Sequence, residues 1–148
     1  MSDKPKVKTA VAANAGWYTF LDGSNFPYGL SNPPINFNSS NVRDFLQMDF
    51  HVLIGSADTD ITSSVNQSNG ANNQGANRFQ RANNFFSYTQ KIVDQNKLEF
   101  NWSFQIVNGV AHSNPRMSRA AAQILLDWKI GRPDWTWTND LCHVKAAL

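Results

Sequence analysis

Residues 50–60 read Phe-His-Val-Leu-Ile-Gly-Ser-Ala-Asp-Thr-Asp, a short apolar run that leads into a Gly-x-x-Asp turn. Short apolar runs bounded by glycine are typical of strands buried in a parallel sheet. The turns that follow parallel strands meet at one rim of the sheet. This stretch therefore predicts a buried strand over residues 50–54, with Asp58 at the rim and Asp60 two residues further on.

A second strand pattern covers residues 98–107, where apolar and polar residues alternate. This alternation predicts a half-exposed strand at a sheet edge. The strand runs into a Gly-x-x-His turn over residues 109–112. If the two strands are parallel neighbours, Asp58 and His112 come to the same rim.

The remaining patterns predict an α/β fold. Residues 7–14 favour a short strand, residues 42–47 a helical turn, and residues 75–96 and 115–128 longer helices with apolar stripes. Strands that alternate with helices imply a parallel sheet with right-handed crossovers. We therefore expect about three parallel strands with flanking helices in a single, incomplete domain over residues 1–148.

Two stretches are predicted to be loops. Residues 15–41 are rich in Gly, Pro, Asn and Ser but carry many large rings, which indicates a packed loop or lid rather than a disordered linker. Residues 61–76 are polar and without periodicity, as in a long surface loop. We expect residues 1–6 to be a flexible tail, and we leave the structure of residues 131–148 open.

An acid after one strand and a histidine after the next are the last two members of a Ser…Asp…His triad. Such a histidine takes a proton from serine and returns it to a leaving group, while the carboxylate orients the ring. Asp is also an ordinary turn and capping residue. Asp58 is our main candidate for the acid, Asp60 is the alternative, and His112 is the candidate base.

The nucleophile of such a triad is absent from this sequence. A Gly-x-Ser-x-Gly elbow should precede the acid, and none occurs among the 148 residues. Ser56 and Ser113 are the serines nearest to the motifs, and neither lies in an elbow. We therefore expect the rear part of a hydrolase that is inactive alone and needs the missing N-terminal half as its partner.

The chain from Val11 to Leu126 resembles the C-terminal part of bacterial α/β-hydrolase-fold proteins of the esterase and lipase-like type. The matching segments are residues 12–18, 26–30, 54–60, 74–78 and 107–112. The resemblance implies a small-molecule ester as substrate, Asp58 as the triad acid and His112 as the base. It also implies a substrate cleft near the aromatic stretch 17–37, with Trp17, Tyr18, Tyr28 and Arg78 as candidates.

Composition excludes several other classes. The net charge is only +2, from 13 basic and 11 acidic residues, which gives no electrostatic case for nucleic acid. No apolar run is long enough to span a membrane, and the first residues have no signal-peptide core, so we expect a soluble chain whose location stays open. Cys142 is the single cysteine. We expect no cofactor and no metal, since the histidines and acids lack ligand spacing.

One alternative function belongs to a different class. The aromatic-rich loop 17–37 could make the chain a non-enzymatic module that binds a carbohydrate or a protein, because Trp and Tyr rings provide flat, amphipathic contact area. The same rings could equally pack the loop against the sheet.

Overall fold

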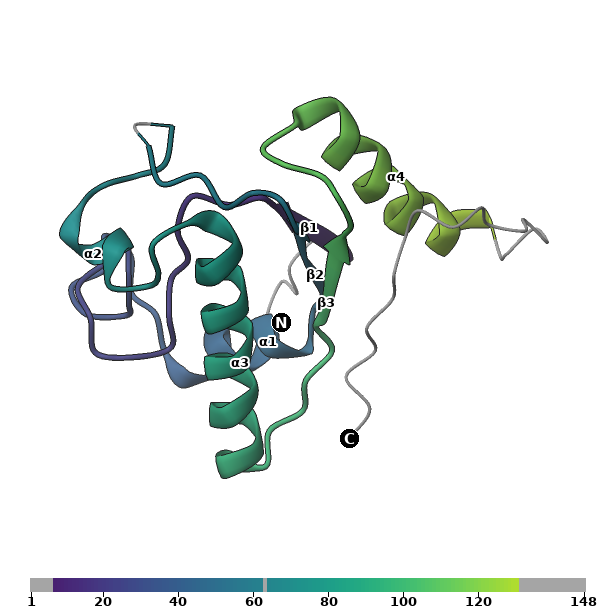
Figure 1. Cartoon of the computed structure of the whole chain (residues 1–148). Helices are drawn as coiled ribbons and strands as arrows, with labels where there is room; N and C mark the ends of the chain where they lie inside the picture. Colours follow the sequence, from purple (N-terminus) through teal and green to yellow (C-terminus); the bar gives the residue numbers. More distant parts are fainter. Residues whose placement is uncertain (1–6, 63, 131–148) are drawn as a thin grey trace.

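The computed structural model describes residues 7–62 and 64–130, and it has an α/β fold (Figure 1). The sheet consists of β1 (Thr9–Ala13), β2 (Asp49–Gly55) and β3 (Ser103–Val107), in that order. Both pairs of neighbours are parallel. The predicted α/β fold with three parallel strands is confirmed. The predictions for residues 1–6 and 131–148 lie outside the described residues.

Four helices connect or follow the strands: α1 (Ser39–Gln47), α2 (Asn69–Asn72), α3 (Arg78–Asn96) and α4 (Asn114–Ile130). Asparagine caps set two of the helix starts. Asn38 forms a capping box with Asn41, so α1 begins three residues before the predicted turn. The Asn77 side chain accepts from the backbone of Gln80, so α3 begins at residue 78 rather than 75.

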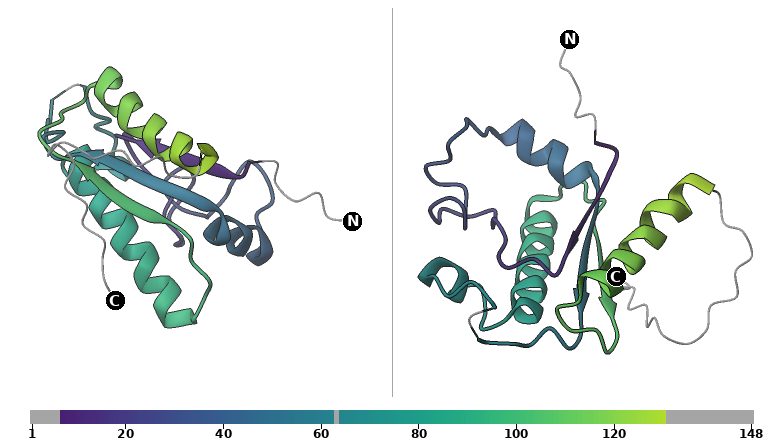
Figure 2. Two further views of the ribbon diagram at one scale, coloured as in Figure 1. Left: turned by 90° about the vertical axis from the view of Figure 1, so that its right-hand side faces the viewer. Right: turned by 90° about the horizontal axis from the view of Figure 1, so that it is seen from above.

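The helices cover both faces of the sheet (Figure 2). On one face, α1 and α3 pack against Val52 and Ile54 of β2. On the other face, α4 packs through Met117 and Ala120 against Leu53. The alternation of side chains along β2 thus divides the interior into two cores, one on each side of the sheet.

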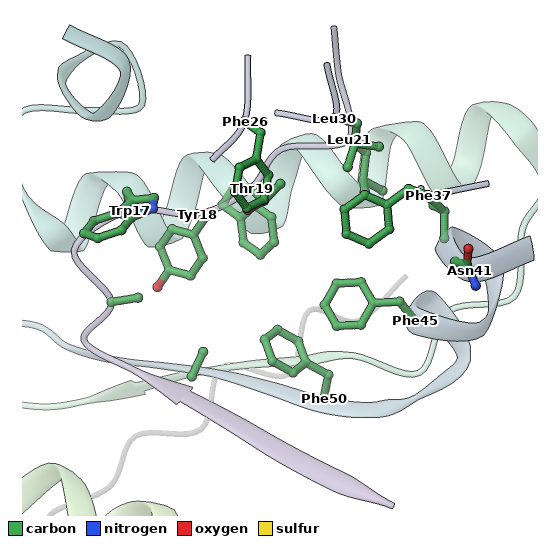
Figure 3. A pocket seen from close by; sticks show the side chains of 14 residues that line it. Trp17, Tyr18, Thr19, Leu21, Phe26, Leu30, Phe37, Asn41, Phe45 and Phe50 are labelled. Atoms are coloured by element: carbon green, nitrogen blue, oxygen red, sulfur yellow. The ribbon is translucent and has the colours of Figure 1, made fainter. Parts of the chain in front are cut away.

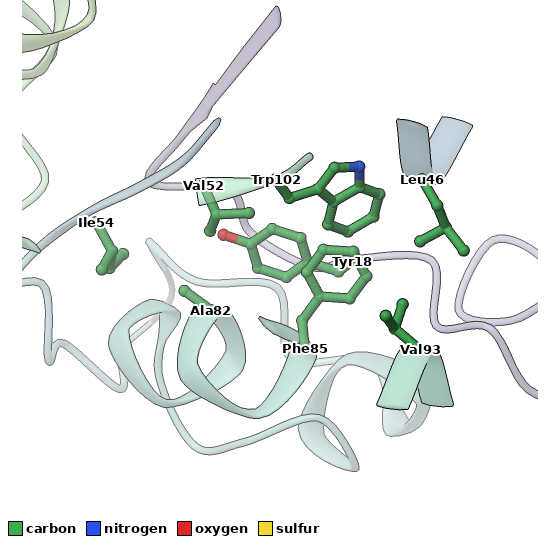
Figure 4. Close-up of a cluster of buried hydrophobic side chains, with 8 residues drawn as sticks. All are labelled: Tyr18, Leu46, Val52, Ile54, Ala82, Phe85, Val93 and Trp102. Carbon is green, nitrogen blue, oxygen red and sulfur yellow. The ribbon is translucent and has the colours of Figure 1, made fainter. Parts of the chain in front are cut away.

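The larger core is aromatic (Figure 4). Tyr18 stacks on Phe85 with ring centroids 4.5 Å apart, and Trp102 meets Phe45 edge to face at 4.7 Å. The Trp102 indole N–H donates to the carbonyl of Phe45 at 2.9 Å, so its polar atom is satisfied inside the core. The rings of Tyr18 and Phe20 contact Phe85 and Tyr88 of α3, so the long loop is packed against this helix.

The predicted strand over residues 98–107 is too long, because only residues 103–107 pair with β2. Before that point the chain is bonded to the end of α1. Asn101 donates its backbone N–H to the carbonyl of Leu46 and its side-chain amide to that of Gln47. The apolar members of the alternation still face one side, since Leu98, Phe100 and Trp102 all pack in the aromatic core.

Candidate active site

The turns that follow β2 and β3 are hydrogen-bonded to each other. Ser56 donates its backbone N–H to the carbonyl of Val107 at 3.0 Å, and Ala57 donates to the carbonyl of Val110 at 3.0 Å. The Ser56 hydroxyl accepts the backbone N–H of Gly109 at 2.8 Å. These bonds extend the parallel ladder past the strand ends and hold the two rim turns side by side.

The residue at the end of β2, Gly55, lies too close to the next turn to carry a side chain. A Cβ atom on Gly55 would lie 2.1 Å from the carbonyl oxygen of Val110, which is far inside van der Waals contact. Gly109 has a positive φ of 67°, a conformation that glycine adopts without strain. The two glycines therefore let the turns touch and let the second turn bend back.

Asp58 and His112 are in direct contact at this rim. The Nδ1 atom of His112 lies 3.1 Å from Oδ2 of Asp58. The Asp58 side chain is fully buried, whereas the His112 side chain is 53% exposed. A neutral imidazole in this contact carries its proton on Nδ1, so its second nitrogen, Nε2, is the one that can exchange protons with another group.

Arg78 approaches the other oxygen of the same carboxylate. Its Nη1 atom lies 3.5 Å from Oδ1 of Asp58, and the Arg78 side chain is 7% exposed. The guanidinium also donates to the carbonyl of Ser64. Arg78, a cleft candidate from the sequence, lines neither of the two cavities described below.

Asp60 faces its own loop. Its carboxylate accepts the backbone N–H and the hydroxyl of Thr62 and the hydroxyl of Ser64, each at 2.8 Å. The bond from the Thr62 backbone and those from the two hydroxyls lower the pKa of this exposed carboxyl. Of the two acids considered from the sequence, Asp58 is the one hydrogen-bonded to His112.

An apolar cavity of about 420 Å³ lies between the sheet and the long loop (Figure 3). Trp17 and Tyr18 line it, together with Phe26, Phe37 and Phe45. Tyr18 itself is buried. Burial raises the pKa of its hydroxyl, and that oxygen has no hydrogen-bond partner within the described residues.

A second, more polar cavity of about 610 Å³ lies beside Tyr28, the remaining cleft candidate. Asp22, Asn25 and Tyr88 also line it. Neither Asp58 nor His112 lines either cavity. The structure therefore brings the predicted acid and base together. Of the four cleft candidates, Trp17, Tyr18 and Tyr28 line the two cavities, and Arg78 contacts Asp58.

One polar residue that the sequence did not single out, Asn14, joins the two rim turns. Asn14, at the end of β1, accepts the backbone N–H of Gly55 at 2.8 Å and donates to the carbonyl of Ala111 at 3.2 Å. Arg81 is fully buried and donates to the carbonyls of Gly75 and Gly16.

The described residues form no cluster of side chains suited to a metal ion. Within residues 7–62 and 64–130, no group of three or more His, Cys, Asp and Glu side chains could hold a metal ion. His51 of β2 instead contacts Ser103 of β3 at 2.6 Å and Asp49 of its own strand at 3.1 Å. None of the helices in this part of the chain is long and apolar enough to cross a membrane.

Two solved structures are similar to this chain. The first is poly(aspartic acid) hydrolase-1 from Sphingomonas sp. KT-1, at 33% identity and a TM-score of 0.72, over 80% of this chain and 45% of that one. The second is the poly(3-hydroxybutyrate) depolymerase LpqC from Bordetella parapertussis, at 30% identity and a TM-score of 0.74, over 85% of this chain and 42% of that one.

The chain thus spans less than half the length of the solved structures that it matches. No family model and no curated protein matches it. Both neighbours are hydrolases of the α/β-hydrolase type. The three-stranded parallel sheet and flanking helices of this chain match the fold of these two hydrolases, at 30–33% identity.

Proposed function

We propose that this chain supplies the acid and the histidine of a serine hydrolase that cleaves esters, with Asp58 as the acid and His112 as the base. The observation that carries the proposal is the contact of 3.1 Å between Asp58 Oδ2 and His112 Nδ1 at the carboxyl end of parallel strands. A buried carboxylate behind an exposed imidazole is the arrangement that general-base catalysis by histidine requires.

The chemistry assigned to each group follows from this geometry. His112 takes the proton of a serine hydroxyl on Nε2 as the serine attacks the ester carbonyl, and then gives it to the leaving alcohol. Asp58 keeps the proton on Nδ1 and stabilises the imidazolium. The serine and the donors for the oxyanion come from another stretch of polypeptide, because the sequence has no Gly-x-Ser-x-Gly elbow.

The neighbours favour this reaction class. One is named as a hydrolase of poly(aspartic acid) and the other as a depolymerase of poly(3-hydroxybutyrate). Both names describe cleavage of an acyl bond in a polymer, which a serine nucleophile with an acid–histidine pair can perform. We therefore extend the proposed substrate class from small esters to the ester links of a polyester.

The sheet indicates where the serine-bearing stretch would dock. Both helices that connect the strands, α1 and α3, lie on the same face of a sheet ordered β1-β2-β3. A further parallel strand beside β1, joined by a right-handed crossover, would place its helix on this same face. That helix would cover the apolar cavity beside β1, where the Trp17 and Phe37 side chains are both 43% exposed.

A segment exchange tests the proposal. In LpqC, the part that this chain matches is replaced by residues 7–130, and hydrolysis of a p-nitrophenyl ester is measured. We expect turnover that His112→Ala lowers by about 10⁴-fold or more and that Asp58→Asn lowers by about 10⁴-fold. Asp60→Asn is the matched control and should leave the rate within a few fold.

The second part of the test uses the 148-residue chain alone. We expect it to hydrolyse the ester no faster than background, because no activated nucleophile is present. Turnover by the chain alone that His112→Ala abolishes would place the nucleophile within this sequence. A folded, active exchange protein that is indifferent to both Asp58→Asn and His112→Ala would refute the assignment of the pair.

A further inference from the structure

We infer that Arg78 is a positioning residue for this site: it holds the Asp58 carboxylate turned so that Oδ2 faces His112. This inference rests on the proposed function, because it concerns the same acid–histidine pair. It assigns a role to a residue that lines neither of the two cavities and contacts the Asp58 carboxylate.

The carboxylate has one partner on each oxygen. Oδ2 faces His112 Nδ1 at 3.1 Å, and Oδ1 faces Arg78 Nη1 at 3.5 Å. Neither Oδ1 nor Nη1 has a hydrogen-bond partner within the described residues, so the ion pair is their main compensation. A buried charge without a partner is strongly disfavoured, and removal of one member of such a pair leaves the other uncompensated.

The fixed position of Arg78 makes it suited to this task. It is the first residue of α3, and the next residue, Phe79, donates its backbone N–H to the carbonyl of Asp58 at 3.1 Å. The guanidinium is also held by the carbonyl of Ser64. The start of α3 therefore contacts Asp58 through both the backbone and a charged side chain. Because the Arg78 side chain is buried, its orientation relative to Asp58 is fixed.

Arg81 provides a matched comparison on the same helix. It is also buried and also donates hydrogen bonds, at 2.8 Å to the Gly75 carbonyl, 2.6 Å to the Gly16 carbonyl and 3.0 Å to Asn72 Oδ1. All three acceptors are neutral, and none belongs to the acid–histidine pair. Loss of Arg81 therefore tests the effect of removing a buried arginine without removing the charge beside Asp58.

The experiment reads the tautomer of His112 in the full 148-residue chain. Long-range ¹H–¹⁵N spectra of the imidazole at a pH where the ring is neutral distinguish the Nδ1–H form from the Nε2–H form. We expect the Nδ1–H form to predominate in the wild type. Asp58→Asn is the reference variant, and it should lose this preference because the carboxylate that accepts the Nδ1 proton is gone.

Arg78 is then changed in two ways that separate charge from packing. Arg78→Gln keeps a donor for Ser64 but has no charge, and Arg78→Lys keeps the charge. We expect Arg78→Gln to lose the Nδ1–H preference and Arg78→Lys to retain a larger share of it. Arg81→Gln should keep the wild-type tautomer although it unfolds at a lower denaturant concentration.

Each variant is compared while its amide spectrum shows a folded chain, so a loss of stability alone does not count. The inference is overturned if Arg78→Gln keeps the wild-type tautomer, or if Arg78→Gln and Arg78→Lys are indistinguishable. A wild type that lacks the Nδ1–H preference, or does not respond to Asp58→Asn, would refute the proposed pairing itself, which is a separate result.

Discussion

The amide oxygen of Asn14 lies 2.8 Å from the backbone nitrogen of Gly55 and accepts its hydrogen bond. The amide nitrogen of the same side chain donates to the carbonyl of Ala111, next to His112. Asn14 also has a positive φ of 47°, a conformation in which asparagine is favoured over most residues. The side chain of the residue that follows β1 thus joins the turn before Asp58 to the turn before His112.

Replacing Asn14 with glycine should weaken this junction. Asn14→Gly keeps the backbone conformation and removes both hydrogen bonds, so we expect the free energy of unfolding in urea to fall by about 1–3 kcal/mol. The Gly55 amide should also exchange with solvent faster. Asn32→Gly is the control, since Asn32 has a φ of 53° but is exposed, and it should change stability by less than about 0.5 kcal/mol. Equal effects of the two variants would contradict this role.

The contact between the rim turns predicts a cost for any side chain at residue 55. A Cβ on Gly55 would meet the Val110 carbonyl, so Gly55→Ala must push the two turns apart. We expect a loss of about 1–3 kcal/mol, measured by denaturant unfolding, together with changed NMR shifts at His112. Gly16→Ala has no atom within 4 Å of its new methyl group and should leave both quantities near their wild-type values.

The aromatic core predicts a large effect at Phe85. Its ring is 3% exposed and stacks on Tyr18 at 4.5 Å, with Trp102 at 5.6 Å. Phe85→Ala should lower the free energy of unfolding by about 3–5 kcal/mol, because a cavity replaces the ring. Ile61→Ala, at a position that is 65% exposed, should have little effect. A change of under about 1 kcal/mol for Phe85→Ala would show that the core rearranges.

The buried hydroxyl of Tyr18 predicts a dependence of stability on alkaline pH. Burial raises the pKa of this group above its usual value of 10.0, so the unfolded chain ionises first. Its contribution to stability is full below pH 10 and decreases as the pH rises above that value. Tyr18→Phe should flatten this decrease in urea unfolding measured from pH 8 to 11.

The same variant should not lose stability at neutral pH, because within the described residues the Tyr18 hydroxyl has no hydrogen-bond partner to lose. Tyr28→Phe is the control. It removes a hydroxyl that is bonded to Ser68 at 2.5 Å and should keep the alkaline decrease. If Tyr18→Phe retains the wild-type slope above pH 10, another group is responsible.

The meeting of Asp58 and His112 could be predicted because it follows from local patterns. An apolar run and an alternating run each ended in a glycine turn, and neighbouring parallel strands bring such turns to one rim. The length of β3 could not be predicted in the same way. Leu98 and Phe100 continue the alternation, but their backbone follows the end of α1 instead of β2, and side-chain periodicity does not reveal the hydrogen-bond partner.

The roles of Arg78 and Asn14 beside the acid–histidine pair could not be predicted from sequence patterns. Arg78 lies twenty residues after Asp58, and only the return of the chain at the start of α3 brings them together. From the sequence, Arg78 was a candidate for the substrate cleft instead. Asn14 looked like the last residue of a small strand, and its role depends on a positive φ and on two turns distant in the sequence.

The two cores have a consequence for how such a site can change over generations. Asp58 is held from the aromatic core, through Arg78 and Phe79 of α3, whereas the turn that carries His112 is anchored by Val110 in the core beneath α4. Substitutions under one layer therefore act first on one member of the pair, and they reach the other through the hydrogen bonds between the two turns.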